Sequence, residues 1–89
     1  QPARNHLMNK YLAQTIIDNG GRLHPLAVLT LPGDGSHSIE PFVEETAATA
    51  YIDGTLVIGS TIPAGFRRVR RCSEYPEVWV CKKDDTANS

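Results

Sequence analysis

The chain has 89 residues, of which 40% are hydrophobic and 21% charged, and its formal net charge is −1. This length suffices for one domain and is too short for two, and the composition excludes an intrinsically disordered chain. A net charge near zero excludes a global field that steers the protein to nucleic acid or to a membrane, and no apolar run approaches the ~20 residues of a membrane span. The first residue is Gln1 rather than Met, so we expect a processed form or a part of a longer chain.

Residues 3–19 predict an amphipathic helix. Its apolar face combines side chains at helical spacing, namely Leu7, Met8, Tyr11, Leu12, Thr15 and Ile16. Pro2 suits the start of a helix, where its missing N–H costs nothing. Gly20-Gly21 supplies a left-handed stop, so we expect the helix to end close to Asn19. The apolar face is expected to pack into the core.

The remainder of the chain, residues 23–83, predicts antiparallel strands. Leu23–Leu31 is the first, and Pro25 must lie at the strand start or on a sheet edge because it lacks a backbone donor. Residues 38–45 alternate in part and predict a second strand. Pro41 argues against a central position for that strand.

Two hairpins are expected to follow. Residues 46–59 contain Asp53-Gly54 between two β-rich arms, which favours a type I′ turn. The last hairpin is predicted from residues 66–73 and 78–83, with its bend at Tyr75-Pro76.

This order of elements predicts an α+β fold with a single domain spanning residues 1–89. One N-terminal helix packs on a curled antiparallel sheet of four to six strands, because short connections favour a meander. Cystatin-like rolls and small helix-capped barrels have this shape, although the chain carries no residue motif of either family. Residues 84–89 are expected to form a flexible tail.

Cys72 and Cys81 are the only cysteines. If the chain folds back symmetrically around residues 75–78, the two lie directly opposite each other, and a slight narrowing of the ladder would allow a disulfide. Such a bridge would contribute ~2–3 kcal/mol to a domain with a small core. It would imply a secreted, periplasmic or cell-surface setting. Two free thiols in a cytoplasmic protein are the alternative, whereas a metal site would need further ligands and a redox pair is more often C-x-x-C.

The basic residues are concentrated near the C-terminus. Residues 66–89 hold six of the nine, namely Arg67, Arg68, Arg70, Arg71, Lys82 and Lys83. Regular strand geometry would place Arg68 and Arg70 on one face, and Arg67 and Arg71 on the other. These six cations are the candidates for an anion-binding surface.

The hairpin register that aligns the cysteines would also set Arg71 opposite Lys82 and Arg70 opposite Lys83, and such like-charge pairs are destabilising. An anionic partner could neutralise them, with Tyr75 and Trp79 stacking on bases or sugars. The alternatives are a solvated edge strand whose arginines block aggregation, or internal pairing with nearby acids.

No motif indicates catalysis. The histidines form no i, i+4 pair, no G-x-S-x-G elbow occurs, and Gly33-Asp34-Gly35 is too short for a dinucleotide loop. We therefore expect a protein that is not an enzyme and uses no metal and no cofactor. Two functions remain: an extracytoplasmic protein-interaction module, whose partner is another protein, or a polyanion- or nucleic-acid-binding domain that uses residues 66–71 and 82–83.

Overall fold

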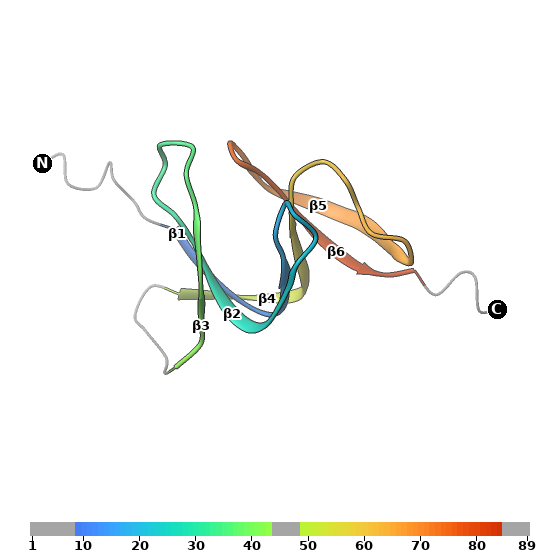
Figure 1. Ribbon diagram of the computed structural model, residues 1–89, viewed down its shortest axis with the longest axis horizontal. Coiled ribbons are helices and arrows are strands. Elements are labelled where there is room, and N and C mark those ends of the chain that lie inside the picture. The colour runs from blue at the N-terminus through green and yellow to red at the C-terminus, as the bar shows by residue number, and fades with distance from the viewer. Residues whose placement is uncertain (1–8, 44–48, 85–89) are drawn as a thin grey trace, which may run out of the picture.

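The computed structural model describes residues 9–43 and 49–84, and these residues form six strands and no helix. The strands are β1 (Asn9–Ile17), β2 (Leu23–Leu31), β3 (Ser38–Pro41), β4 (Thr49–Ile58), β5 (Phe66–Glu74) and β6 (Glu77–Lys83). They join one sheet in the order β3-β2-β1-β4-β6-β5 (Figure 1). Neighbouring strands are antiparallel except β1 and β4, which are parallel. The sheet is therefore mixed, and the predicted antiparallel meander is wrong.

The predicted α+β fold is wrong, because residues 9–17 form a central strand instead of the end of a helix. β1 is hydrogen-bonded to β2 on one side and to β4 on the other. Ile16 and Ile17 point to opposite faces, and both are buried. A strand buried on both faces need not alternate, so its apolar residues can imitate helical spacing. Residues 3–8 of the predicted helix lie outside the described residues.

The sheet bends sharply along a line that crosses β2, β1 and β4. In the parallel ladder Asp53 and Gly54 together stand opposite Gln14 alone, which makes a β-bulge. Gly54 has a φ of 142°, and Leu26 of β2, at the same level of the sheet, has a φ of 45°. Figure 1 shows β1, β2 and β4 turning upward at this line. The predicted hairpin at Asp53-Gly54 is therefore wrong: residues 49–58 are one bent strand, and residues 46–48 lie outside the described part.

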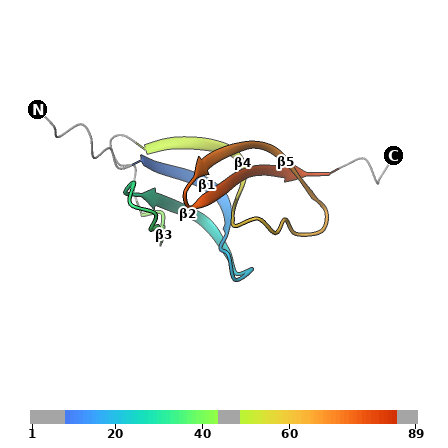
Figure 2. The ribbon, with the colours of Figure 1, turned by 90° about the horizontal axis from the view of Figure 1, so that it is seen from above.

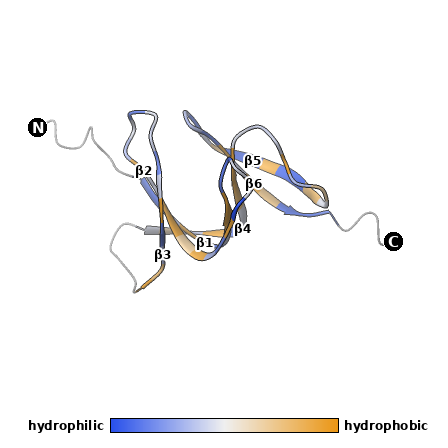
Figure 3. Ribbon diagram, viewed as in Figure 1, coloured by the Kyte–Doolittle hydropathy of each residue, from blue (hydrophilic) through white to orange (hydrophobic). Residues whose placement is uncertain are grey.

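The bend wraps the sheet around one main core, to which all six strands contribute. Its buried side chains are Ala13, Ile16, Ala27, Leu29, Leu31, Ile52, Leu56, Ile58, Val78 and Val80. Ile39 of β3 and Cys72 of β5 pack against it from the two edge strands. Figure 3 shows the apolar residues along the curved part of the sheet, and Figure 2 shows β5 and β6 crossing it from above.

A second, smaller cluster lies on the other face of the sheet. It contains Ile17, Val57 and Cys81, with three partly buried neighbours, Ile62, Phe66 and Trp79. Since successive residues of a strand point to opposite faces, Val80 belongs to the main core and Cys81 to this cluster.

Several local predictions are confirmed. β2 has the predicted limits, and Pro25 lies before the stretch of β2 that pairs with β3. β3 is an edge strand, as Pro41 indicated, but it ends at Pro41, so the prediction of a strand over residues 38–45 is wrong for residues 42 and 43. The last hairpin bends at Tyr75-Pro76, and that peptide bond is cis. In the predicted tail, Asp84 donates its backbone N–H to Gly65 O at 2.8 Å. The rest of the tail, residues 85–89, and residues 44 and 45 of the predicted second strand lie outside the described part.

Candidate functional site

Two bulges in β5 decide where its arginines point. Val69 and Cys72 are extra residues in the ladder with β6, so Arg68 pairs with Cys81 and Arg71 with Trp79. Arg68 and Arg71 therefore share the face of Trp79. The predicted division of the arginines between the two faces, which assumed a regular strand, is wrong.

The same bulges separate the cysteines. Cys81 lies opposite Arg68, not opposite Cys72, and the structure holds both cysteines as free thiols. Cys72 packs against the main core while Cys81 belongs to the cluster on the other face. The predicted register and its Cys72–Cys81 bridge are therefore wrong. Burial raises the pKa of both thiols, and this effect outweighs the opposing influence of Tyr11 and Arg70 on Cys72 and of Arg68 on Cys81.

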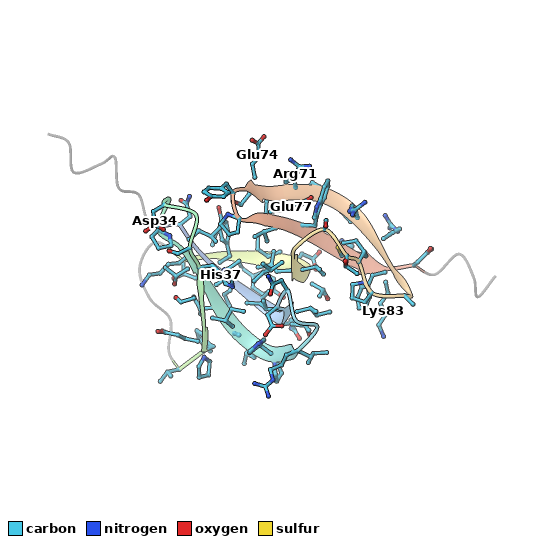
Figure 4. All side chains as sticks on the ribbon, turned by 45° about the horizontal axis from the view of Figure 1, so that its top comes forward. Asp34, His37, Arg71, Glu74, Glu77 and Lys83 are labelled. Atoms are coloured by element: carbon cyan, nitrogen blue, oxygen red, sulfur yellow. The ribbon has the colours of Figure 1, made fainter. Side chains whose placement is uncertain are left out.

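Trp79 is engaged by its neighbours. The guanidinium carbons of Arg68 and Arg71 lie over its ring, 4.8 and 4.7 Å from the centroid. Trp79 Nε1 donates to Glu77 Oε2 at 2.7 Å, and Arg71 Nη2 lies 3.8 Å from the same oxygen. Arg68 Nη2 donates to Ser60 O at 2.7 Å. Figure 4 shows Arg71 and Glu77 together on the β5–β6 hairpin. Two guanidinium groups already lie over the ring proposed for stacking on bases or sugars.

The remaining basic residues do not form one surface with these two. Arg70 lies opposite Val80, a main-core residue, and near Tyr11 and Cys72. Arg67 lies directly opposite Lys82 at the other end of the hairpin, where Figure 4 places Lys83. The six cations thus divide into a pair around Trp79, a single Arg70 and a group of three.

The group of three borders a shallow pocket of about 460 Å³ at the outside of the bend. We call it the basic corner pocket, and its lining residues are Gln14, Tyr51, Asp53, Gly54, Thr55, Arg67, Cys81, Lys82 and Lys83. Lys82 Nζ lies 3.4 Å from Asp53 Oδ2, a pair whose side chains are 44% and 86% exposed. Ion pairs this exposed are weak, so Lys82 is free to take another partner at little cost.

Beside this pocket one half of β4 has an open edge. β6 pairs with β4 only from Thr55 to Ile58. Over Thr49–Asp53 the same side of β4 carries no strand formed by the described residues. Tyr51, in the middle of this open half, is 57% exposed. The sequence analysis missed this edge because it assigned Asp53-Gly54 to a hairpin turn. The only sequence signal of the bent strand is Gly54, and a glycine is found in β-bulges as well as in turns.

We also searched the described residues for a metal site and for a membrane-spanning helix. Within residues 9–43 and 49–84 no group of three or more His, Cys, Asp or Glu side chains could hold a metal ion. The same residues contain no helix long and apolar enough to cross a membrane. Comparison of the chain with protein-family models, curated proteins and solved structures finds no match.

Proposed function

We propose that this protein is a non-catalytic protein-interaction domain that binds an extended acidic segment of a partner protein, which adds to the sheet along the open half of β4. The observation that carries the proposal is the juxtaposition of residues 49–53, whose outer edge pairs with no strand among the described residues, with the three cations of the basic corner pocket.

The open edge offers the hydrogen bonds that such a partner needs. In a strand, the backbone N–H and C=O of one residue point to one side, and those of the next residue point to the other side. Those of Thr49–Asp53 that face away from β1 have no partner strand among the described residues, whereas β6 takes this position from Thr55 onward. An added strand would continue the ladder, and main-chain hydrogen bonds would supply affinity.

The charges around the edge favour an acidic segment. Arg67 and Lys82 lie directly opposite each other, and like charges in that position repel. Lys83 adds a third cation, while Asp53 is the only acidic residue among the described ones that line the pocket. A carboxylate from the partner would relieve this repulsion and guide the encounter.

The alternative of a polyanion-binding domain has less support from the geometry. A long polyanion needs a continuous track of cations, whereas Arg68 and Arg71 are engaged with Trp79 and Arg70 lies opposite a core residue. An extracytoplasmic setting stays a prediction, and because both cysteines are free thiols it loses the disulfide on which it was based.

The experiment measures the fluorescence anisotropy of a labelled peptide that alternates Glu and Val, against a control peptide that alternates Lys and Val. We expect only the acidic peptide to bind, and Lys83→Gln to weaken its binding roughly threefold to tenfold. Arg22→Gln is the matched control, since it removes one positive charge from the β1–β2 turn, outside the pocket, and should leave binding unchanged.

Hydrogen exchange distinguishes strand addition from charge attraction alone. The bound acidic peptide should slow exchange of outward-facing amides within Thr49–Asp53. Equal binding of both peptides, equal effects of Lys83→Gln and Arg22→Gln, or binding without amide protection would overturn the proposal. A heparin fragment that binds more tightly than the peptide and protects none of these amides would favour the polyanion alternative.

A further inference from the structure

A groove of about 760 Å³ lies between the β1–β2 turn and the β4–β5 loop. Its apolar side chains are Ile17, Leu23, Ile58, Pro63 and Phe66, and of the described residues that line it only Asp18 is charged. We call it the Asp18 groove. It shares no lining residue with the basic corner pocket, so it is a separate candidate site.

The first wall of the groove is fixed by hydrogen bonds around Asp18. Asp18 N donates to Arg22 O at 3.0 Å, and Gly21 N donates to Asp18 O at 2.9 Å. The side-chain Oδ1 accepts from the backbone N–H groups of Gly20 and Arg22, both at 2.9 Å. His24 Nε2 lies 3.0 Å from Oδ2. The carboxylate is therefore held in one orientation.

The second wall is tied to the β5–β6 hairpin. Gly59 N donates to Glu77 O at 2.8 Å, and Ser60 O accepts from Arg68 at 2.7 Å. The two walls meet where Gly59 approaches Asn19, since a Cβ added to Gly59 would lie 3.3 Å from Asn19 Cβ. A groove with both walls fixed in this way loses little conformational freedom when a ligand enters, which is typical of small-molecule sites.

The charge and hydrogen-bonding capacity of Asp18 define what the groove would accept. A carboxylate has about four lone-pair sites for hydrogen bonds. Oδ1 uses two of them on Gly20 and Arg22, and Oδ2 uses one on His24, which leaves one acceptor position on Oδ2. Within the described part of the chain no Lys or Arg lines the groove, so its charge favours a cation over an anion.

We propose that the Asp18 groove binds a small organic amine, with its ammonium group on Asp18 Oδ2 and its apolar part over Leu23 and Phe66. Leu23 is 58% exposed, so an apolar ligand would remove from water a surface that the fold leaves uncovered. An ammonium group would form a charge-assisted hydrogen bond, which is roughly twice as strong as a neutral one.

The test is an NMR titration of the ¹⁵N-labelled protein with hexylamine, hexanol and hexanoate, which share one chain and differ in charge. We expect shifts at the amides of residues 18–23 and 59–66, with hexylamine binding about tenfold more tightly than hexanol and hexanoate weakest. Equal affinities for the three probes, tighter binding of hexanoate, or shifts elsewhere would overturn the proposal.

The variant Asp18→Asn separates ligand recognition from the structure of the turn. Its amide oxygen can still accept from Gly20 and Arg22, so the turn is retained, while the charge and the free acceptor position are lost. Hexylamine should then bind no more tightly than hexanol. Asp34→Asn is the control, because Asp34 accepts from Ser36 N at 3.0 Å in a loop outside the groove. An unchanged preference for hexylamine in Asp18→Asn would contradict the assignment.

Discussion

The ring of Tyr75 lies directly against the backbone of Gly35. A methyl group added to Gly35 would lie 2.3 Å from Tyr75 Cε2 and 2.7 Å from Cζ. Gly35 belongs to the loop that leads into β3, and Tyr75 to the turn that follows β5, so this contact joins the two edge strands of the sheet order. Figure 1 shows the two loops beside each other at the top. The contact therefore links the loop before β3 to the turn after β5.

Gly35→Ala should therefore lower the free energy of unfolding by about 2–3 kcal/mol, since the strain of a positive φ is joined by the cost of moving the ring of Tyr75, which is 76% exposed, out of this contact. Gly33→Ala is the matched control. Gly33 has a φ of 105°, similar to the 94° of Gly35, but no atom of the described residues lies within 4 Å of an added Cβ. Chemical denaturation of both variants gives the difference. In the background of Tyr75→Ala the two substitutions should cost the same, and equal costs with Tyr75 present would contradict the contact.

The elements that could be predicted from the sequence are those in which local signals agree with the final pairing. Leu23–Leu31 is β-rich and bounded by turn residues, and Tyr75-Pro76 stands between two strand-like arms. The prediction for residues 9–17 was wrong because their apolar spacing fits a helix, and only the pairing with β2 and β4 makes them a strand. Such long-range pairing is a tertiary effect that overrides local preference.

The sequence identified which basic residues are candidates for the site, but it could not predict how their side chains are arranged on the sheet. The six cations were identified, yet each bulge in β5 moves every later residue to the other face. Val69 and Cys72, the extra residues, carry no sequence signal for a bulge. For this reason neither the Arg67–Lys82 pair nor the separation of the cysteines followed from the strand pattern.

Gly54 is required where β4 passes β6. A Cβ on Gly54 would lie 2.8 Å from Cys81 O, a backbone atom that cannot move aside, and its φ is 142°. We expect Gly54→Ala to cost about 3 kcal/mol or more in unfolding free energy. Gly65→Ala, at a φ of 90° with open space around it, should cost only about 1–2 kcal/mol. Thermal and urea unfolding measure both, and a smaller loss in Gly54→Ala than in Gly65→Ala would argue against the close approach.

Trp79 is the only tryptophan, so its fluorescence reports directly on the arginines over its ring. Arg68→Ala and Arg71→Ala should each cost about 0.5–1 kcal/mol and make the indole more accessible to acrylamide quenching. Arg67→Ala removes the same charge from the same strand without touching the ring, and should leave quenching unchanged. Identical quenching in all three variants would exclude the cation–π contacts.

The two cysteines should titrate as free thiols. In native protein Cys72, which is partly buried, should react with a thiol reagent well before Cys81, which is fully buried. Both should react after denaturation, and a reductant should leave the melting temperature unchanged, because no bridge constrains the unfolded chain. A mass about 2 Da below that of the reduced chain would restore the disulfide hypothesis and the extracytoplasmic setting.

Because of the Asp18 carboxylate, the free energy of unfolding should decrease as the pH falls in the acid range. The hydrogen bond with His24, followed by that from the Arg22 backbone, lowers its pKa from the ordinary 3.8 to about 2. The folded state then binds this proton less tightly than the unfolded state, so the contribution is complete above about pH 4 and is lost as the pH falls toward 2. Asp18→Asn should show a shallower loss of stability than wild type across this window and a parallel curve above it. Asp34, whose pKa is also lowered by hydrogen bonds from Ser36, contributes to the pH dependence of stability with the same sign. The double variant Asp18→Asn/Asp34→Asn should therefore lose even less stability in acid than Asp18→Asn.

Urea midpoints measured from pH 2 to 6 test this expectation. Curves of wild type and Asp18→Asn that stay parallel over the whole range would show that the Asp18–His24 contact is not formed in solution.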